Sequence, residues 1–266
     1  MLLAACEEEP PELGQHDYAE LPVTACDPAE KLGKAGITDG YETADGVVFN
    51  VRTPANYRPD VAHPLLVVYA PGGHDAFENE ELIQLTLEAT SAGFLIAYAA
   101  DRRLDLTAIE DLAEIPAVVG RRWCVDLDRV ALTGHSSGGL VASAVAFSDH
   151  SSGLAAAIAP SAAGITGAQL SERDCPAPMS VMVMHGRRDT LFPLAKGHGA
   201  EAARWWAGCN RCDAEPVPSG RGACVAFTGC AEGVETLYCE TDTPHTTWPD
   251  LNGPLMDFLV AGTKDG

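Results

Sequence analysis

Basic side chains are scarce in this chain of 266 residues, and lysine is the scarcest of them. The sequence has 17 Lys and Arg against 38 Asp and Glu, a formal net charge of −21, with lysine at only four positions. Because nucleic-acid backbones bind basic surfaces, we expect no nucleic-acid partner. The acidic excess favours solubility in a crowded or saline medium over a specific preference for neutral substrates.

Long apolar runs, internal repeats and low-complexity tracts are missing as well. No stretch of 18 residues is apolar throughout, so the sequence lacks the pattern of a membrane-spanning helix. Nothing repeats or shows the heptads of a coiled coil, which leaves a purely structural role without support. With 46% apolar residues, the length suits one large α/β domain or two small ones, and we expect a monomer.

Cysteine, in contrast, is plentiful. Nine occur, and setting Cys6 aside leaves an even number, which fits four disulfides formed in an oxidising compartment. Cys209 and Cys212 have the C-x-x-C spacing of redox and zinc sites, but no thioredoxin-like βαβ context and no second such pair accompanies them. We therefore predict structural disulfides, with the pairing left open, among Cys26, Cys124, Cys175, Cys209, Cys212, Cys224, Cys230 and Cys239.

The ninth cysteine lies near the N-terminus. Cys6 follows Leu3-Ala4-Ala5, which resembles a bacterial lipobox, although only five residues precede it where a signal segment has roughly 15–30. We expect Cys6 to be lipidated, with the acidic residues 7–12 as a tether and no other membrane contact. The protein is then extracytoplasmic, either secreted or lipid-anchored at the bacterial cell envelope. The expected division is a tail over residues 1–40 and one folded domain over 41–266.

Strand-like and helix-like patterns alternate along the folded domain. This alternation predicts an α/β fold with a mostly parallel central sheet, helices on both faces and no large lid domain. The candidate inserts are residues 161–178 and 208–233. We expect strands at 46–52, 65–70, 93–99, 130–133, 154–159, 179–186 and 234–240, and helices at 79–92, 106–119, 140–147, 195–207 and 254–260.

One motif joins the expected strand at 130–133 to the expected helix at 140–147. Residues 134–138 read Gly-His-Ser-Ser-Gly, a Gly-x-Ser-x-Gly pentapeptide with Ser136 at its centre. A tight turn between strand and helix holds such a serine in a strained conformation, and its hydroxyl then stands clear of the sheet. The helix N-terminus directs its amides toward developing negative charge. Ser136 is therefore the candidate nucleophile.

A serine nucleophile needs a base and an acidic residue that orients the base. In α/β-hydrolases these follow the serine in the order Asp or Glu, then His, at the ends of later strands. Asp189 falls in the loop directly after the strand at 179–186, which makes it the candidate acid. Asp174 precedes that strand and Asp213 lies in the cysteine-rich segment, so both are poorly placed.

His245 is the candidate base. It follows the last expected strand and precedes the last expected helix, whereas His150 and His198 lie at or within helical regions. We expect His245 to take the proton from Ser136 and later to protonate the leaving alcohol, with Asp189 fixing its tautomer. A turn-forming Asp and a surface His would be ordinary features taken singly, but their order and positions together favour the catalytic interpretation.

The negative charge of a tetrahedral intermediate requires two backbone amides. One should belong to Ser137, and the other to the glycine loop after residues 65–70, at Gly73 or His74. For substrate binding, we expect contacts from His135, Phe77 and Trp248, whereas Trp205 and Trp206 suit packing. No metal or cofactor is expected.

These segments together resemble a known family. Residues 125–139 (VDLDRVALTGHSSGG), 185–189 (HGRRD), 244–249 (PHTTWP) and a cysteine-containing segment after a Trp-bearing helix are similar to secreted esterases grouped with polyhydroxybutyrate depolymerases and feruloyl or acetylxylan esterases. The resemblance covers about residues 42–260. Where that family has His-Gly in its oxyanion loop and Gly-His before the aromatic-Pro pair, this chain has Pro71-Gly72 and Pro244-His245.

The resemblance implies an α/β-hydrolase fold and cofactor-free ester hydrolysis through an acyl-enzyme. It implies an ester substrate, a small molecule or polymer, such as a polyester, a feruloyl ester or an acetylated sugar. Two alternatives remain open: a serine peptidase of the same fold, disfavoured by the lack of a propeller or cap domain, and a non-catalytic lipoprotein that binds a ligand. Removing Ser136 would abolish turnover in an enzyme and leave binding intact in a binding protein.

Overall fold

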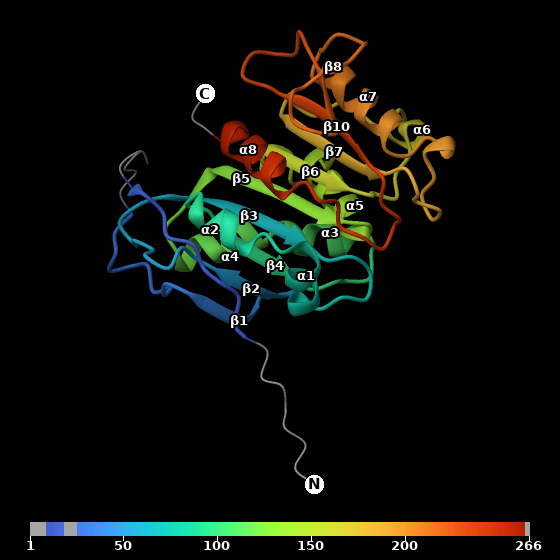
Figure 1. The fold of residues 1–266 in the computed structure, drawn as a ribbon. Helices are drawn as coiled ribbons and strands as arrows, with labels where there is room; N and C mark the ends of the chain where they lie inside the picture. The colour runs from blue at the N-terminus through green and yellow to red at the C-terminus, as the bar shows by residue number, and fades with distance from the viewer. Residues whose placement is uncertain (1–8, 19–25, 264–266) are drawn as a thin grey trace.

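The computed structural model describes residues 9–18 and 26–263. Its centre is a ten-stranded sheet with the spatial order β1-β2-β4-β3-β5-β6-β7-β10-β9-β8 (Figure 1). The strands are β1 (Ile37–Glu42), β2 (Val48–Arg52), β3 (His63–Tyr69), β4 (Leu95–Ala99), β5 (Val125–His135), β6 (Ala157–Ser161), β7 (Ser180–Gly186), β8 (Val217–Pro218), β9 (Cys224–Phe227) and β10 (Thr236–Thr241).

The six middle strands are parallel, and two antiparallel strands flank them on each side. Every residue of β3 is buried, because helices cover both faces of a sheet whose parallel strands need crossover connections. The carboxyl ends of β5, β7 and β10 consequently lie at one edge of the sheet. That edge is where an α/β sheet places its ligand site.

Alternate residues of the middle strands enter two different cores, as β3 shows. Leu65, Val67 and Tyr69 pack with one set of helices, whereas Leu66 and Val68 pack with the other. The first set is α3 (Leu106–Ala113), α4 (Ile115–Arg122), α5 (Ser137–Phe147) and α7 (Ala200–Cys209); the second is α1 (Ala76–Ile83), α2 (Thr86–Ser91) and α8 (Asn252–Gly262), on the near face in Figure 1. The short α6 (Gly167–Leu170) packs on α7.

Two helices expected as continuous are interrupted. The segment predicted at 79–92 divides because Gln84 adopts a left-handed conformation and ends α1. The segment predicted at 106–119 divides at Glu114, and α4 begins with Pro116 in its first turn, where a proline lacks no hydrogen bond. Apolar spacing showed that these segments are helical but did not show the breaks, because the apolar face continues across each one.

Four disulfides join the eight cysteines beyond Cys6, as predicted. They are Cys26–Cys124, Cys175–Cys209, Cys212–Cys230 and Cys224–Cys239. Three of them lie in the C-terminal third, where they fix the cysteine-rich segment that forms β8 and β9. The pair Cys224 and Cys239 stands directly opposite across β9 and β10.

Part of the N-terminal segment predicted as a tail packs on the domain. The Gly14 N–H donates to Thr90 Oγ1 at 2.7 Å, and Ala55 N–H donates to the Gly14 carbonyl. β1 already begins at Ile37, so the sheet includes residues on the tail side of the expected boundary at 41. Cys6 lies outside the described residues. Among the residues described, no helix is long and apolar enough to cross a membrane.

Candidate active site

Ser136 lies at the turn between β5 and α5. Its backbone has φ 56° and ψ −117°, a conformation that is unfavourable for any residue other than glycine. Two backbone hydrogen bonds hold it there: Ser136 N–H donates to the Ser161 carbonyl at 2.9 Å, and Leu140 N–H donates to the Ser136 carbonyl at 3.0 Å. The turn therefore has the strained geometry expected of a nucleophile elbow.

The glycines of the motif permit close approach between strand and helix. A Cβ atom on Gly138 would lie 2.0 Å from the Tyr69 carbonyl oxygen, and one on Gly134 would lie 2.6 Å from the same atom. Any side chain at either position would separate α5 from β3 and β5. The spacing of small residues in the sequence thus results from the packing that the turn requires.

A continuous chain of hydrogen bonds joins three of the predicted residues. The His245 ring lies with Nδ1 2.7 Å from Asp189 Oδ2 and Nε2 2.9 Å from Ser136 Oγ. Because an ionised carboxylate only accepts, His245 carries its proton on Nδ1 and its Nε2 accepts from the Ser136 hydroxyl. The structure therefore brings together Ser136, His245 and Asp189, from the ends of β5, β10 and β7.

Asp189 is held in place by its own loop. Its Oδ1 accepts the N–H groups of Leu191 and Phe192 at 2.9 and 2.8 Å, which leaves Oδ2 for His245. Burial alone would raise the pKa of Asp189, but the Phe192 N–H and the hydrogen bond and charge of His245 outweigh burial and lower it. The carboxylate stays ionised and can stabilise a charged imidazole. His185, buried below it, donates from Nε2 to the Phe192 carbonyl at 2.8 Å.

His135 does not line an open substrate site as the sequence analysis expected. It is the last residue of β5 and only 3% exposed. Its Nε2 lies 2.5 Å from the His245 carbonyl, and its Nδ1 lies 3.1 Å from Ser161 Oγ. Burial lowers its pKa to about 4, so the ring is neutral at pH 7. The side chain supports the site from within the fold.

The amides expected to stabilise an oxyanion differ in availability. Ser137 is the first residue of α5, and its N–H has no partner in the part of the chain that the structure describes. In the glycine loop, however, Gly73 N–H donates to Asp101 Oδ2 at 2.8 Å and His74 N–H donates to the Pro71 carbonyl at 3.2 Å. Neither predicted loop donor is free in this arrangement.

Gly72 is the alternative in that loop. Its N–H has no hydrogen bond within residues 9–18 and 26–263, and a Cβ on it would lie 3.5 Å from Ser137 Oγ. Ser137 Oγ itself is buried and has no partner among the same residues. The sequence could not distinguish Gly72 from Gly73, because the distinction depends on Asp101, which is 28 residues further along the chain.

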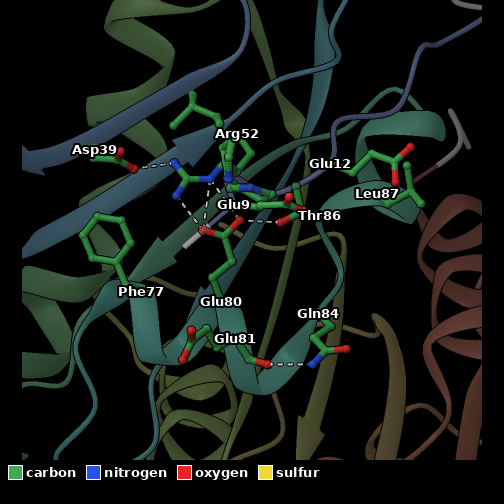
Figure 2. A pocket seen from close by; sticks show the side chains of 13 residues that line it. Glu9, Glu12, Asp39, Arg52, Phe77, Glu80, Glu81, Gln84, Thr86 and Leu87 are labelled. Atoms are coloured by element: carbon green, nitrogen blue, oxygen red, sulfur yellow. Dashed lines mark hydrogen bonds and ion pairs between the residues drawn. The ribbon is translucent and has the colours of Figure 1, made fainter. Parts of the chain in front are cut away.

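Trp248 and Phe77, two of the predicted substrate contacts, line two different cavities. Trp248 donates from Nε1 to Asn252 Oδ1 at 2.7 Å and lines a cavity of about 390 Å³ together with Thr246 and Thr247, which follow His245. Phe77 is 53% exposed and lines a different cavity of about 500 Å³ (Figure 2). That second cavity is lined by none of Ser136, Asp189 and His245, so Phe77 has no demonstrated relation to the site.

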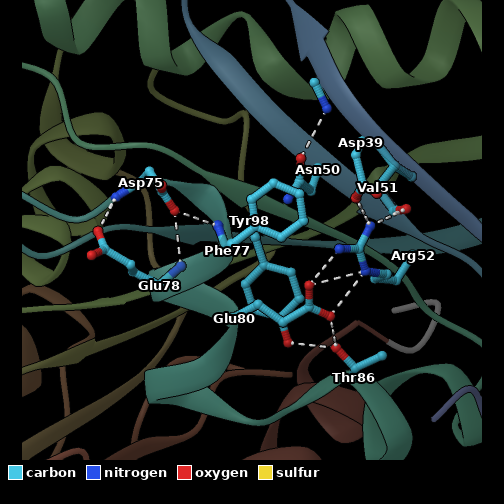
Figure 3. Close-up of polar contacts among 11 residues, drawn as sticks. Asp39, Asn50, Val51, Arg52, Asp75, Phe77, Glu78, Glu80, Thr86 and Tyr98 are labelled. Atoms are coloured by element: carbon cyan, nitrogen blue, oxygen red, sulfur yellow. Dashed lines mark hydrogen bonds and ion pairs between the residues drawn. The ribbon is translucent and has the colours of Figure 1, made fainter. Parts of the chain in front are cut away.

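The larger cavity contains a buried charge cluster that sequence analysis missed. Arg52 is 1% exposed; its Nε donates to both carboxylate oxygens of Glu80, at 2.9 and 3.0 Å, and its Nη1 donates to Asp39 at 2.6 Å (Figure 3). Thr86 donates to Glu80 at 2.6 Å and lies 3.0 Å from the Tyr98 hydroxyl. A charged residue at the end of the strand-like segment 47–51 was the only signal in the sequence.

Burial lowers the pKa of Arg52, but the hydrogen bonds and charges of Glu80 and Asp39 outweigh it, so the pKa is raised and the guanidinium stays charged. The two carboxylates thus share one cation, Arg52, within the fold. Among the described residues, no group of three or more His, Cys, Asp or Glu side chains is arranged to hold a metal ion.

No protein-family model matches the chain, and no curated protein matches it in sequence. Solved structures do resemble it. An acetyl xylan esterase from Aspergillus awamori is 14% identical with a TM-score of 0.61, over 85% of this chain and 100% of the other. Esterase 2 of Thermogutta terrifontis, phosphonylated by cyclosarin, is 15% identical with a TM-score of 0.51, over 86% and 92%.

A thermostable esterase is 13% identical with a TM-score of 0.52. The match covers 63% of this chain and 50% of the thermostable esterase. Identities this low establish the fold alone. The strand order, the six parallel strands, the helices on both faces and these structural neighbours agree on one architecture. This chain has the α/β-hydrolase fold.

Proposed function

We propose that this protein is a serine esterase that hydrolyses carboxylic esters through an acyl-enzyme on Ser136. The single observation that carries the proposal is the unbroken hydrogen-bond chain from Asp189 through His245 to Ser136 at a strained turn. Position and protonation agree at each link, because only this tautomer of His245 lets Nε2 accept the serine proton. The esterases among the structural neighbours support the same chemistry.

The reaction follows from these positions. Ser136 Oγ attacks the ester carbonyl while His245 Nε2 takes its proton, and Asp189 stabilises the imidazolium that forms. The oxyanion is stabilised by the free N–H groups of Ser137 and Gly72. His245 then donates its proton to the leaving alcohol, which departs and leaves the acyl group on Ser136. Water, deprotonated by His245, hydrolyses that acyl-enzyme and restores the serine.

The substrate class and location are part of the same proposal. Polyester, feruloyl and acetyl esters are the candidate substrates, in keeping with the sequence resemblance and with an acetyl xylan esterase among the neighbours. Four disulfides support an oxidising, extracytoplasmic compartment. Lipidation at Cys6 would hold the enzyme at the cell envelope, and a monomer suffices because one chain supplies all three residues.

The test compares the wild type with Ser136→Ala on p-nitrophenyl acetate and butyrate. We expect turnover from the wild type and a loss of at least about 10³-fold in the variant, since the nucleophile is removed. His150→Gln is the control, because that side chain is 74% exposed and outside the site. Equal hydrolysis by wild type and Ser136→Ala would refute the proposal. If only the wild type hydrolyses the esters, polyester film, feruloyl esters and acetylated xylan are compared next as substrates.

A further inference from the structure

The ring of His135 joins two parts of the active site through its two nitrogens. The His245 carbonyl is only an acceptor, so the proton of the neutral His135 ring lies on Nε2 and is donated there at 2.5 Å. Nδ1 then accepts from the Ser161 hydroxyl at 3.1 Å. The carbonyl contact fixes this tautomer of the neutral ring, and the Ser161 hydroxyl, which can donate or accept, is compatible with it.

Ser161 continues the connection to the nucleophile. It is the last residue of β6, 1% exposed, and its carbonyl accepts the N–H of Ser136 at 2.9 Å. A second route between nucleophile and base therefore exists beside the direct contact of their side chains. It runs from Ser136 N–H to Ser161, from the Ser161 hydroxyl to His135, and from His135 Nε2 to the backbone of His245.

We propose that His135 is a positioning residue that fixes the backbone of the general base, His245, relative to the nucleophile, Ser136. This inference rests on the proposed esterase function of the same site. His245 belongs to a loop, and its ring is held by hydrogen bonds with Asp189 and Ser136 and by an edge contact with Phe192, whose ring centroid lies 4.9 Å away. Among the residues that the structure describes, His135 is the only one that hydrogen-bonds to the His245 carbonyl.

The consequence for catalysis is geometric. Proton transfer requires Nε2 and Oγ to keep their 2.9 Å separation as charge moves, and misplacement by about 1 Å can lower a rate about 10²-fold. Losing the His135 bond frees the loop backbone without altering any group that contacts substrate. The turnover number, kcat, should therefore fall, whereas KM should stay unchanged.

Two substitutions of His135 separate positioning from mere volume. Glutamine places an amide nitrogen near the position of Nε2 and keeps a donor for the His245 carbonyl. Asparagine is too short for that contact and keeps only a group near Nδ1 for Ser161. We expect His135→Asn to lower kcat by about 10–10²-fold with KM within about twofold, and His135→Gln to restore most of the loss.

Ser161→Ala provides a second variant if His135→Asn does not fold. Removing the hydroxyl leaves the His135 ring without its Nδ1 partner, so kcat should fall in the same sense. In a double-mutant cycle, Ser161→Ala should cost little more in the His135→Asn background, because the two residues act through one connection. Fully additive losses would overturn the proposed route.

A measurement independent of turnover separates this inference from the proposed function. The NMR resonance of the His245 Nδ1 proton, which lies in the bond to Asp189, should move in His135→Asn and return toward its wild-type position in His135→Gln, with His150→Gln unchanged. If the wild type hydrolyses no ester and Ser136 resists a fluorophosphonate probe, the esterase proposal fails, while this resonance still decides the positioning role. An unmoved resonance in His135→Asn, together with identical kcat in the Asn and Gln variants, would overturn the positioning role.

Discussion

Two polar clusters of this protein use buried charge in opposite ways. Around Arg52, the cation and its carboxylate partners occupy one another's hydrogen-bonding groups, and the guanidinium is 1% exposed. Around Ser136, one carboxylate is buried and fully bonded, but the serine is only partly covered and the side chain of His245 is 14% exposed. The first cluster is closed, and the second ends in the partly covered hydroxyl of Ser136.

The difference shows how to separate a structural polar cluster from a reactive one. The larger cavity lies beside the closed cluster, and its size alone would make it the first candidate for a site. Its buried Arg52 and Glu80, however, are already paired with each other, and an ion pair of this kind is a structural contact that carries out no chemistry. At Ser136, by contrast, hydrogen bonds run in series from Asp189 through His245 to the partly covered serine hydroxyl, an arrangement that proton transfer requires.

The sharpest test of this contrast is Asp189→Asn. The amide keeps an oxygen for the Leu191 and Phe192 amides, but its nitrogen cannot accept from His245 Nδ1, so the imidazole is driven toward the wrong tautomer. We expect kcat to fall about 10⁴-fold with little change in Tm. Kinetics on a p-nitrophenyl ester and thermal unfolding by circular dichroism measure both, and retention of activity would remove Asp189 from the mechanism.

Arg52→Met should have the opposite effect, a loss of stability without a loss of kcat. Removing the cation leaves Glu80 and Asp39 without their partner, one of them buried, which costs about 3–5 kcal/mol of unfolding free energy. The kcat of the folded fraction should not change. Urea unfolding measures the loss.

Arg58→Met is the matched control, since Arg58 and its partner Asp60 are both well exposed and should leave Tm unchanged. A large loss of activity in Arg52→Met with normal stability would show that the two clusters are functionally linked.

Removing single disulfides tests whether the N-terminal and C-terminal regions affect activity differently. Cys26–Cys124 closes a span of 98 residues and ties the N-terminal segment to the residue before β5, whereas Cys224–Cys239 joins β9 to the strand that precedes His245. Paired Cys→Ser variants should each lose about 2–5 kcal/mol of stability. Only the second should also lower kcat, because it loosens the strand carrying the base. Equal kcat in both variants would contradict this regional division.

Acid should destabilise the fold through three buried histidines, His135, His185 and His63, whose pKa values burial lowers. The pKa of His135 is about 4 in the fold and about 6.5 when unfolded, so between these values the unfolded chain takes a proton that the native ring does not. The stability from His135 is therefore complete above about pH 6.5 and decreases by roughly 3 kcal/mol as pH falls toward 4. His185, also lowered by burial, adds in the same direction.

The depressed pKa of Asp189 acts in a lower range. Its contribution is present above the ordinary carboxyl pKa of about 3.9 and is lost only below it. Urea unfolding at pH 7, 5.5 and 4.5 measures the first loss, and His135→Gln should flatten the slope. An unfolding free energy that is constant across these pH values would show that His135 is not neutral in the fold.

Sequence reasoning predicted the fold and the meeting of Ser136, Asp189 and His245, because both follow from the order of strands and loops along the chain. Buried strands such as β3 are continuous apolar runs, and Ser136, Asp189 and His245 each directly follow a strand, so parallel strand ends bring them together. The disulfides were likewise countable, though their pairing was not, because it depends on which segments meet in space.

The remainder depended on contacts between distant residues. Whether Gly73 or Gly72 offers a free amide is decided by Asp101, and whether His135 faces substrate or the interior is decided by Ser161 and the loop of His245. The Arg52 cluster joins positions 13 and 28 residues away from it. No periodicity in the chain encodes such pairs.

The backbone of Ser136 has an evolutionary consequence. At φ 56° and ψ −117°, glycine would adopt the same turn with less strain, by about 1–3 kcal/mol. Replacing this serine by glycine should therefore make the protein more stable and inactive. A lineage released from selection on turnover should therefore lose this serine early.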